Sequence, residues 1–214
     1  MARHARDERQ VLCDLLLEVG PDAPTLCAGW RTRHLAAHLI VRERRPDVAP
    51  GLVLGGSFAR HTARVTERRA GRPDWDRLVG RLRSGPPAVL RPVDDPINLI
   101  EYFVHHEDVR RAVDGWTPRV LAGEVDDALW RFQRGRIPMQ VRQIRNVDLS
   151  IARPGHDPVT VGRRRSAEAG RPVVVTGEPG ELALYFFGRR NHAVVELTGD
   201  DDGVAEVRSA TFGL

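Results

Sequence analysis

The sequence predicts an α+β protein, in which a mostly α-helical N-terminal part is followed by a small α+β C-terminal domain. Through the first two thirds of the chain, apolar residues recur at the three- and four-residue spacing of amphipathic helices. After Pro138 the pattern changes to alternating or β-branched runs, which are typical of strands. Strands that follow helices in this way indicate an α+β layout or two domains. We place the boundary near residue 140, which gives domains of residues 1–140 and 141–214.

The N-terminal part is predicted to hold six helices, most of them marked by a start or stop signal as well as by apolar spacing. Thr32 and Asp74 stand where N-cap residues are expected. Asp95 and Pro96 place a cap and a first-turn proline ahead of the longest segment, and Pro46 follows the end of the second. The predicted helices are residues 7–19, 33–44, 58–69, 75–82, 97–113 and 124–134.

The C-terminal part is predicted to mix short strands with helices. Residues 147–151 alternate apolar and polar side chains, and residues 172–176 are a β-branched run. The run Arg163-Arg164-Arg165 is interpreted as a loop. The expected strands are residues 147–151, 158–161, 172–176 and 193–197, and the expected helices are residues 179–187 and 203–208.

Composition excludes membrane and disulfide-rich classes of protein. Hydrophobic residues make up 41% and charged residues 29%, and no run reaches the roughly 18 uncharged apolar residues of a membrane span. The charged N-terminal residues lack the apolar stretch of a signal peptide. Cys13 and Cys27 fit neither a disulfide framework nor a CxxC metal site. We therefore expect a cytoplasmic protein that does not associate with membranes.

The charge pattern argues against a nucleic-acid partner. The 33 basic residues are all arginine, against 29 acidic residues, for a net charge of +4. Positive and negative residues are interspersed, as at residues 42–47 and 67–77. A nucleic-acid interface needs one sign of charge clustered on a face, so we expect no nucleic-acid binding.

Histidines and one glutamate in the predicted helices could ligate a metal. Glu101 and His105 are four residues apart, so their side chains lie about 40° apart around the helix and can close on one ion. His38 is flanked by apolar residues and is expected to point inward. His34 lies four residues before His38 and is a rival ligand, whereas His106 faces another direction. From spacing alone, Glu101 and His105 equally fit a buried hydrogen bond without a metal.

Two segments of the chain carry a resemblance to a known family. Residues 25–39, TLCAGWRTRHLAAHL, and residues 101–110, EYFVHHEDVR, resemble the His and ExxxH motifs of the mycothiol-dependent maleylpyruvate isomerase family, of actinobacterial type. That family belongs to the DinB-like superfamily. Residues 177–188 and 194–200 are similar to its small C-terminal domain. The resemblance covers most of the chain in the same order.

The resemblance implies a four-helix bundle that binds a metal, followed by a small α+β domain. By position, the implied metal ligands are His38, Glu101 and His105. This ligand set leaves part of the coordination sphere open and is typical of catalytic Zn²⁺, although Ni²⁺ or Fe²⁺ would also fit. The implied catalytic residues are Arg189 and Arg190, which would hold a substrate carboxylate.

The implied function is that of a metal- and thiol-dependent isomerase or S-transferase. Mycothiol would be the cofactor, and a small carboxylate or other electrophile would be the substrate of a monomer or homodimer. The alternatives are a metal-binding stress-response or sensing protein without turnover, and a metal-dependent hydrolase. Asp108 is interpreted as a surface ion-pair partner of Arg110 or Arg111, with a hydrogen bond to His105 as the alternative. Cys27 is interpreted as a small buried residue that packs beside Trp30, with a ligand or nucleophile role as the alternative.

Overall fold

The protein is an α+β structure, as the sequence predicts. The computed structural model describes residues 4–44, 74–87, 94–141, 144, 146–162 and 170–212. The chain divides into two compact units, Met1–Trp116 and Thr117–Leu214. The predicted helix at 58–69, His61 and the arginine run at 163–165 lie outside the described residues. Within the described part, no helix combines the length and the apolar character that crossing a membrane requires.

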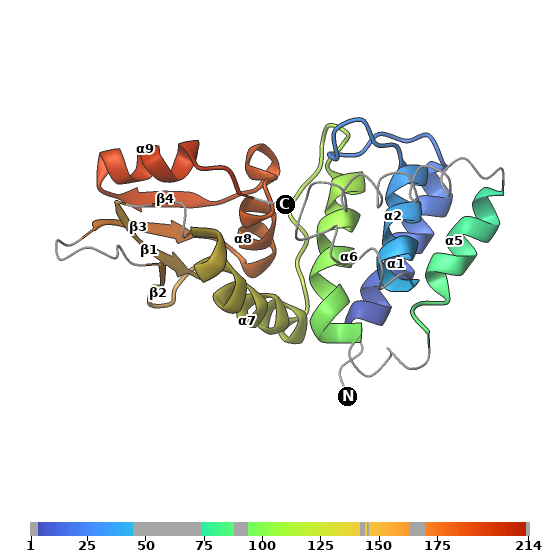
Figure 1. Ribbon diagram of the computed structural model, residues 1–214, viewed down its shortest axis with the longest axis horizontal. Helices are drawn as coiled ribbons and strands as arrows, with labels where there is room; N and C mark the ends of the chain where they lie inside the picture. The colour runs from blue at the N-terminus through green and yellow to red at the C-terminus, as the bar shows by residue number, and fades with distance from the viewer. Residues whose placement is uncertain are drawn as a thin grey trace. The chain divides into compact units, whose positions relative to one another are not determined.

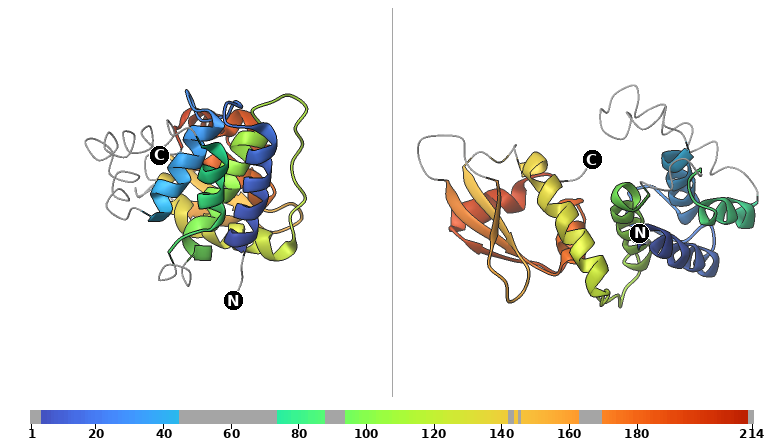
Figure 2. Two further views of the ribbon diagram at one scale, coloured as in Figure 1. Left: turned by 90° about the vertical axis from the view of Figure 1, so that its right-hand side faces the viewer. Right: turned by 90° about the horizontal axis from the view of Figure 1, so that it is seen from below.

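The first unit is helical over its described residues. Its helices are α1 (His4–Val19), α2 (Thr32–Arg44), α5 (Trp75–Arg83) and α6 (Asp94–Arg110). α1 packs against α5 and α6, and α2 packs against the same two helices, so the four described helices form one bundle (Figures 1 and 2). This arrangement agrees with the four-helix bundle that the resemblance implies.

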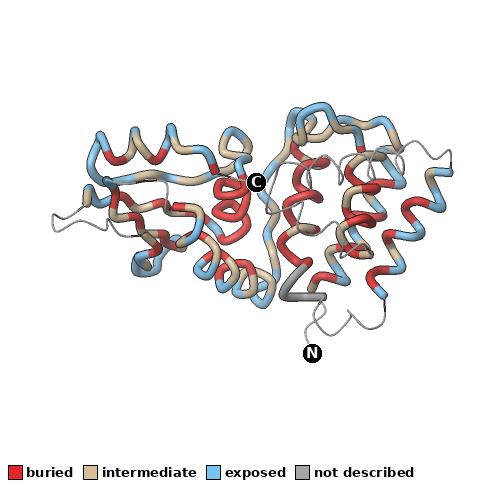
Figure 3. The backbone as a smooth tube through the Cα atoms, in the orientation of Figure 1, coloured by how far each residue is buried: buried red, intermediate tan, exposed pale blue. Residues whose placement is uncertain are grey.

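Apolar stripes at helical spacing explain the packing of the bundle. On α1, the buried side chains of Leu12 and Leu16 repeat at four residues, and on α2 those of Leu35 and Leu39 do the same. Figure 3 shows the buried residues along the inward faces of these helices. Burial of each such leucine contributes about 1.5–3 kcal/mol relative to an exposed side chain.

A buried polar link fixes α2 to α6. Arg9 of α1 donates to the hydroxyl of Tyr102 at 3.3 Å, and that hydroxyl donates to the carboxylate of Glu43 on α2. Burial, followed by the charge and hydrogen bond of Glu43, raises the pKa of Tyr102, so the phenol remains a donor. The three side chains are almost completely buried, and their contacts set the register of the two helices that carry the predicted ligands.

The ends of two helices of the first unit can be compared with the sequence prediction. Asp74 accepts a hydrogen bond from the backbone N–H of Arg77 at 2.9 Å, which confirms the predicted cap of α5. α6 ends at Arg110 rather than at residue 113. The reason is local, because the N–H of Ala112 bonds to the carbonyl of Val109, a tighter turn than an α-helix makes.

The second unit combines helices with one four-stranded sheet. Its elements are α7 (Gly123–Gln140), β1 (Val147–Ala152), β2 (Val159–Gly162), β3 (Arg171–Thr176), α8 (Pro179–Phe186), the 3₁₀ helix η3 (Arg190–His192), β4 (Glu196–Gly199) and α9 (Asp201–Ser209). The strand order is β2-β1-β3-β4. β1 and β3 are parallel, and the two outer pairs are antiparallel. Residues of β1 and β3 share a core with residues of α7, α8 and α9.

Two elements of the second unit differ from the prediction. α7 continues through Pro138 to Gln140, whereas the helix was expected to end near Arg134. Pro138 donates no backbone hydrogen bond and its ring crowds the preceding turn. The burial of Ile137 and the bond from Gln140 to the carbonyl of Phe186 favour continuation of the helix nonetheless. β4 begins at Glu196 instead of Ala193, because the N–H of Val194 donates to the side chain of Glu181.

The boundary between the compact units differs from the predicted boundary near residue 140. Along the chain, the first unit ends at Trp116 and the second begins at Thr117. α7 falls in the second unit because it packs against α8 and therefore belongs with the sheet. Periodicity alone could not assign α7 to a unit, since its helical pattern is the same whichever partner it packs on. Division into domains of residues 1–140 and 141–214 remains a prediction.

Candidate metal centre

Three of the predicted site residues come together in the first unit. His38 lies on α2, and Glu101 and His105 lie one turn apart on α6. One ligand atom from each residue lies within 4.8 Å of the other two. Nε2 of His105 is 3.9 Å from Oε2 of Glu101, and the rings of His38 and His105 have centroids 5.2 Å apart. Two imidazoles and a carboxylate from two helices therefore face a common space.

The second oxygen of Glu101 is held from the neighbouring helix. Arg42 of α2 lies one turn after His38, and its Nη2 is 3.3 Å from Oε1 of Glu101. Its Nη1 donates to the side-chain oxygen of Asn98 on α6. These contacts engage Oε1 with the guanidinium and leave Oε2 on the side of His105. An arginine at this place also compensates the charge of the partly buried carboxylate of Glu101.

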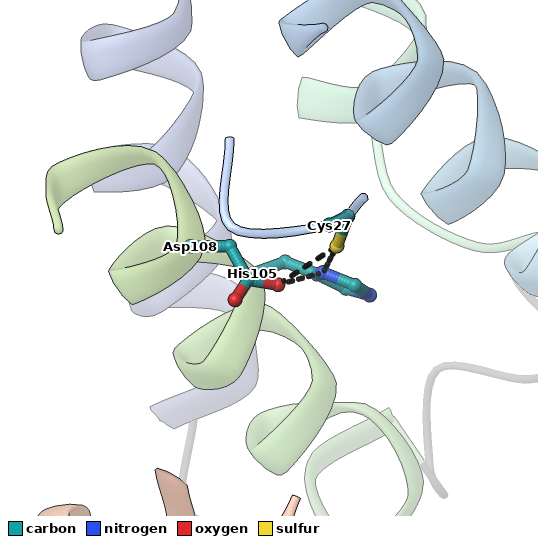
Figure 4. Close-up of side chains that lie close together, drawn as sticks. All are labelled: Cys27, His105 and Asp108. Carbon is teal, nitrogen blue, oxygen red and sulfur yellow. Dashed lines mark hydrogen bonds and ion pairs between the residues drawn. The ribbon is translucent and has the colours of Figure 1, made fainter. Parts of the chain in front are cut away.

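The second nitrogen of His105 is held from the opposite side. Nδ1 of His105 donates to Oδ2 of Asp108 at 2.8 Å, and the thiol of Cys27 donates to the same oxygen at 3.1 Å (Figure 4). The sulfur is also 3.9 Å from Nδ1. Because Nδ1 donates a hydrogen bond to Asp108, Nε2 is the nitrogen that His105 presents toward Glu101.

The surroundings of His105 change its affinity for protons. Burial by itself would lower the pKa of His105. Its hydrogen bonds to Asp108 and Cys27 and the negative charge of Asp108 together raise the pKa by a larger amount, to about 10. The hydrogen bond and the negative charge at Nδ1 therefore favour the protonated ring over the neutral one. A metal at Nε2 competes with a proton for this nitrogen.

The donor set suits a divalent metal ion. Two imidazoles and one carboxylate form the ligand set of catalytic Zn²⁺ sites, with part of the coordination sphere left open, and the same set fits Fe²⁺. Cys27, His105 and Asp108 form a second group of potential ligands within 4.8 Å. Their donors are already joined by hydrogen bonds, so we assign this second group the role of supporting His105.

Two interpretations made from the sequence need correction. Asp108 is completely buried instead of lying at the surface, and it bonds to His105. Glu107 is the neighbour that pairs with Arg110 and Arg111, at 2.8 Å and 2.5 Å. Helical position alone could not decide between the two interpretations of Asp108, because it is three residues from both His105 and Arg111. Cys27 is half-buried and donates to Asp108, so it does more than fill space.

The other described histidines lie apart from the group of His38, Glu101 and His105. Nδ1 of His34 accepts a hydrogen bond from the backbone N–H of Arg31 at 3.0 Å, which occupies this nitrogen at the start of α2. His106 is buried and bonds to Glu8 of α1 at 2.7 Å. The expectation that His106 does not share the site of His105 is consistent with this contact. His4, His156 and His192 are likewise outside both potential ligand groups of the described residues.

The predicted catalytic arginines belong to the second unit and make local contacts there. Nη1 of Arg189 donates to the carbonyl of Phe187 at 2.6 Å. The guanidinium of Arg190 donates to the carbonyl of Arg208 and lies over the rings of Tyr185 and Phe212. Both side chains are half-buried. Their proposed role in holding a substrate carboxylate stays a prediction.

The sequence analysis missed Arg42 and Asn98. The signal for Arg42 was present, because it follows His38 by four residues and therefore shares its face of α2. Asn98 precedes Glu101 by three residues and therefore shares its face of α6. Neither residue type suggests a metal site by itself, which is why only the contact with Glu101 reveals a role.

Comparison with known proteins supports the fold. No family model matches the chain, and no curated protein matches its sequence. Among solved structures, the chain is similar to the crystal structure of a histidine-to-alanine mutant of mycothiol-dependent maleylpyruvate isomerase, with a TM-score of 0.60 and 15% sequence identity. The match covers 91% of this chain and 90% of the other. At this identity the likeness shows a shared fold, and it extends over both parts of the chain.

Proposed function

We propose that this protein holds one divalent metal ion, zinc in the first place, and acts as a metal- and thiol-dependent isomerase or S-transferase. The observation that carries the proposal is the convergence of His38, Glu101 and His105 from two helices. The fold shared with mycothiol-dependent maleylpyruvate isomerase supports it. Mycothiol, or a related low-molecular-weight thiol, is the proposed cofactor.

The residues around the three ligands prepare them for this role. When bound, a divalent ion with an open coordination position lowers the pKa of a thiol ligand and so supplies a thiolate near neutral pH. Asp108 fixes the tautomer of His105, and Arg42 directs one oxygen of Glu101 away from the site. Trp30 packs against His38, with ring centroids 5.1 Å apart. Each ligand thus has a neighbour that restricts its rotation.

The proposed substrate is a small electrophile that carries a carboxylate. An arginine fork matches a carboxylate with two parallel hydrogen bonds, and Arg189 and Arg190 are the residues we propose for this contact. The thiolate would add to an electron-poor C=C bond, whose π electrons move onto the neighbouring carbon; rotation about the remaining single bond and loss of the thiolate would complete an isomerisation. A transferase would instead retain the new carbon–sulfur bond, either as the carbanion takes up a proton or as a leaving group departs with its bonding electrons.

The metal assignment is tested by elemental analysis of protein purified without added metal. Wild-type protein is expected to retain close to one zinc, nickel or iron ion per chain, and His38→Ala to lose it. His34→Ala is the matched control, because His34 lies on the same helix outside the ligand group. Equal retention of metal by the two variants would contradict the assignment.

The thiol assignment is tested by cobalt substitution. Mycothiol added to the Co²⁺ protein should produce an intense sulfur-to-metal charge-transfer band, which water and carboxylate ligands do not give. The band should persist below the pKa of a free thiol, about 8.5, because coordination favours the thiolate. A cobalt spectrum that no thiol perturbs would favour the alternatives, a metal-dependent hydrolase or a metal-binding stress-response or sensing protein without turnover.

A further inference from the structure

The segment between α1 and α2 lies against both histidines of the candidate metal centre. Trp30 packs on the ring of His38, and Cys27 contacts the side chains of His105 and Asp108 (Figure 4). His38 and His105 belong to different helices, so this one short segment contacts a ligand of each. The proposed function uses the contact of Trp30 with His38 but gives no role to the contact of Cys27.

Hydrogen bonds within the segment hold Cys27 and Trp30 at a fixed separation. The N–H of Trp30 donates to the carbonyl of Cys27 at 2.9 Å, which closes a β-turn, and Gly29 in that turn has φ of 76°. A side chain is strained at such a positive φ, so glycine suits this position. The hydroxyl of Thr25 accepts from the N–H of Cys27 and donates to the carbonyl of Trp30.

The turn is also anchored to α6 at the residue that holds His105. The backbone N–H of Leu26 donates to the carbonyl of Asp108 at 2.9 Å, and the thiol of Cys27 donates to Oδ2 of the same residue. Asp108 is completely buried. One of its side-chain oxygens, Oδ2, receives two donors, the thiol of Cys27 and Nδ1 of His105.

We propose that Cys27 is a positioning residue for the metal ligand His105, and that it acts through Asp108. The inference rests on the proposed metal site. The thiol hydrogen bond holds Oδ2 of Asp108 in line with Nδ1 of His105, so that Nε2 keeps one direction toward the metal. Partners that orient metal-ligating histidines commonly alter metal affinity by roughly 10–100-fold. A thiol is a weak hydrogen-bond donor, and Cys27 acts on His105 through Asp108. Its loss is therefore expected to change metal affinity by less than the loss of a direct partner would.

The experiment measures the Zn²⁺ dissociation constant of the full-length protein by competition with a chromophoric chelator. Cys27→Ala is expected to weaken binding about threefold to tenfold, below the range of direct partners. Cys27→Ser keeps a donor on a shorter bond and should recover part of the loss. Cys13→Ala is the matched control, because Cys13 is a buried thiol that bonds to the carbonyl of Val79. It should leave zinc affinity unchanged.

A double-mutant cycle separates a positioning role from simple packing. If Cys27 acts through Asp108, the change Cys27→Ala should have almost no further effect on zinc affinity in an Asp108→Asn background. An unchanged affinity in Cys27→Ala, with Cys27→Ser also unchanged, overturns the inference. An equal loss in both backgrounds overturns it as well, because Cys27 would then act independently of Asp108.

A measurement without metal distinguishes this inference from the proposed function. In the metal-free protein, the ¹⁵N and ¹H resonances of Nδ1 of His105 should shift in Cys27→Ala and remain in place in Cys13→Ala. If the wild-type protein binds no zinc, the proposed function is wrong. The resonances would then still show whether the hydrogen bonds from Cys27 and His105 to Asp108 exist. Zinc binding by the wild type with no effect of Cys27→Ala would leave the function standing and overturn the inference alone.

Discussion

Two glutamates on α6 occupy contrasting environments. Glu101 places one oxygen near His105 and the other 3.3 Å from Arg42, and its side chain keeps 13% of its exposure. Glu107 is completely buried and bonds to Arg110 and Arg111. Glu101 is thus available to an ion, whereas the oxygens of Glu107 are engaged with two arginines of the same helix end.

These environments predict opposite effects for the same substitution. Glu101→Gln should weaken metal binding by more than about 100-fold, the upper end of what outer partners cost, because a charged ligand is lost. Glu107→Gln should keep metal affinity and lower the free energy of unfolding by about 3–5 kcal/mol, since it removes the charge of one partner from the buried ion pair with Arg111. Metal competition and urea unfolding measure the two quantities. A loss of metal affinity in Glu107→Gln comparable to that in Glu101→Gln would contradict this division.

At the scale of elements, an aspartate cap marks the start of the two short helices α5 and α9. α9 starts after Asp200, whose side chain accepts from the N–H of Gly203 at 2.8 Å. The same side chain is 3.3 Å from Arg171 of β3, at a largely exposed position where an ion pair contributes little. The cap is therefore the larger contribution of Asp200, and it directs α9 back along the sheet, where Val207 is buried.

Removal of this cap should destabilise the second unit without affecting the metal site. Asp200→Ala is expected to lower the free energy of unfolding by about 1 kcal/mol, because an N–H of the first turn loses its acceptor. Asp201→Ala is the control, since Asp201 is exposed in the same turn and contributes only through the helix dipole. Circular dichroism in urea measures both variants. A loss in Asp201→Ala as large as that in Asp200→Ala would show that charge at the helix start, and not the cap, matters.

At the scale of the whole molecule, all three proposed ligands lie in the first of two compact units. His38, Glu101 and His105 belong to Met1–Trp116, and so do the residues that hold them. The second unit, Thr117–Leu214, has its own core of sheet and helices. Two units with separate cores need not unfold as one cooperative step.

Metal should therefore stabilise one unit selectively. A ligand at about 100 times its dissociation constant adds about 2.7 kcal/mol to the state that binds it. Calorimetry of the full chain with added zinc should show one transition moving to higher temperature and a second that stays in place. The second transition can be recognised with Asp200→Ala, which should lower it alone. Equal shifts of both transitions with zinc would show that the units unfold together.

The sequence by itself determined the local elements and the ligands on one helix. The predicted α+β class is confirmed, and the cap of α5 and the spacing of Glu101 and His105 follow from the 3.6-residue turn. Such features depend on neighbours within about four residues, so the sequence pattern contains them. Its apolar neighbours predicted that His38 points inward, the resemblance grouped it with the pair on α6, and the structure brings the three together.

Only the tertiary structure decided what surrounds those ligands. Cys27 and His105 are 78 residues apart in the chain, and Arg42 reaches Glu101 from another helix. The burial of Asp108 likewise depends on what packs against α6. The membership of α7 in the second unit depends in the same way on what packs against α7. Contacts of this kind leave no periodic signal, because a cysteine or an arginine has the same local preference whether it meets solvent, a core or a metal ligand.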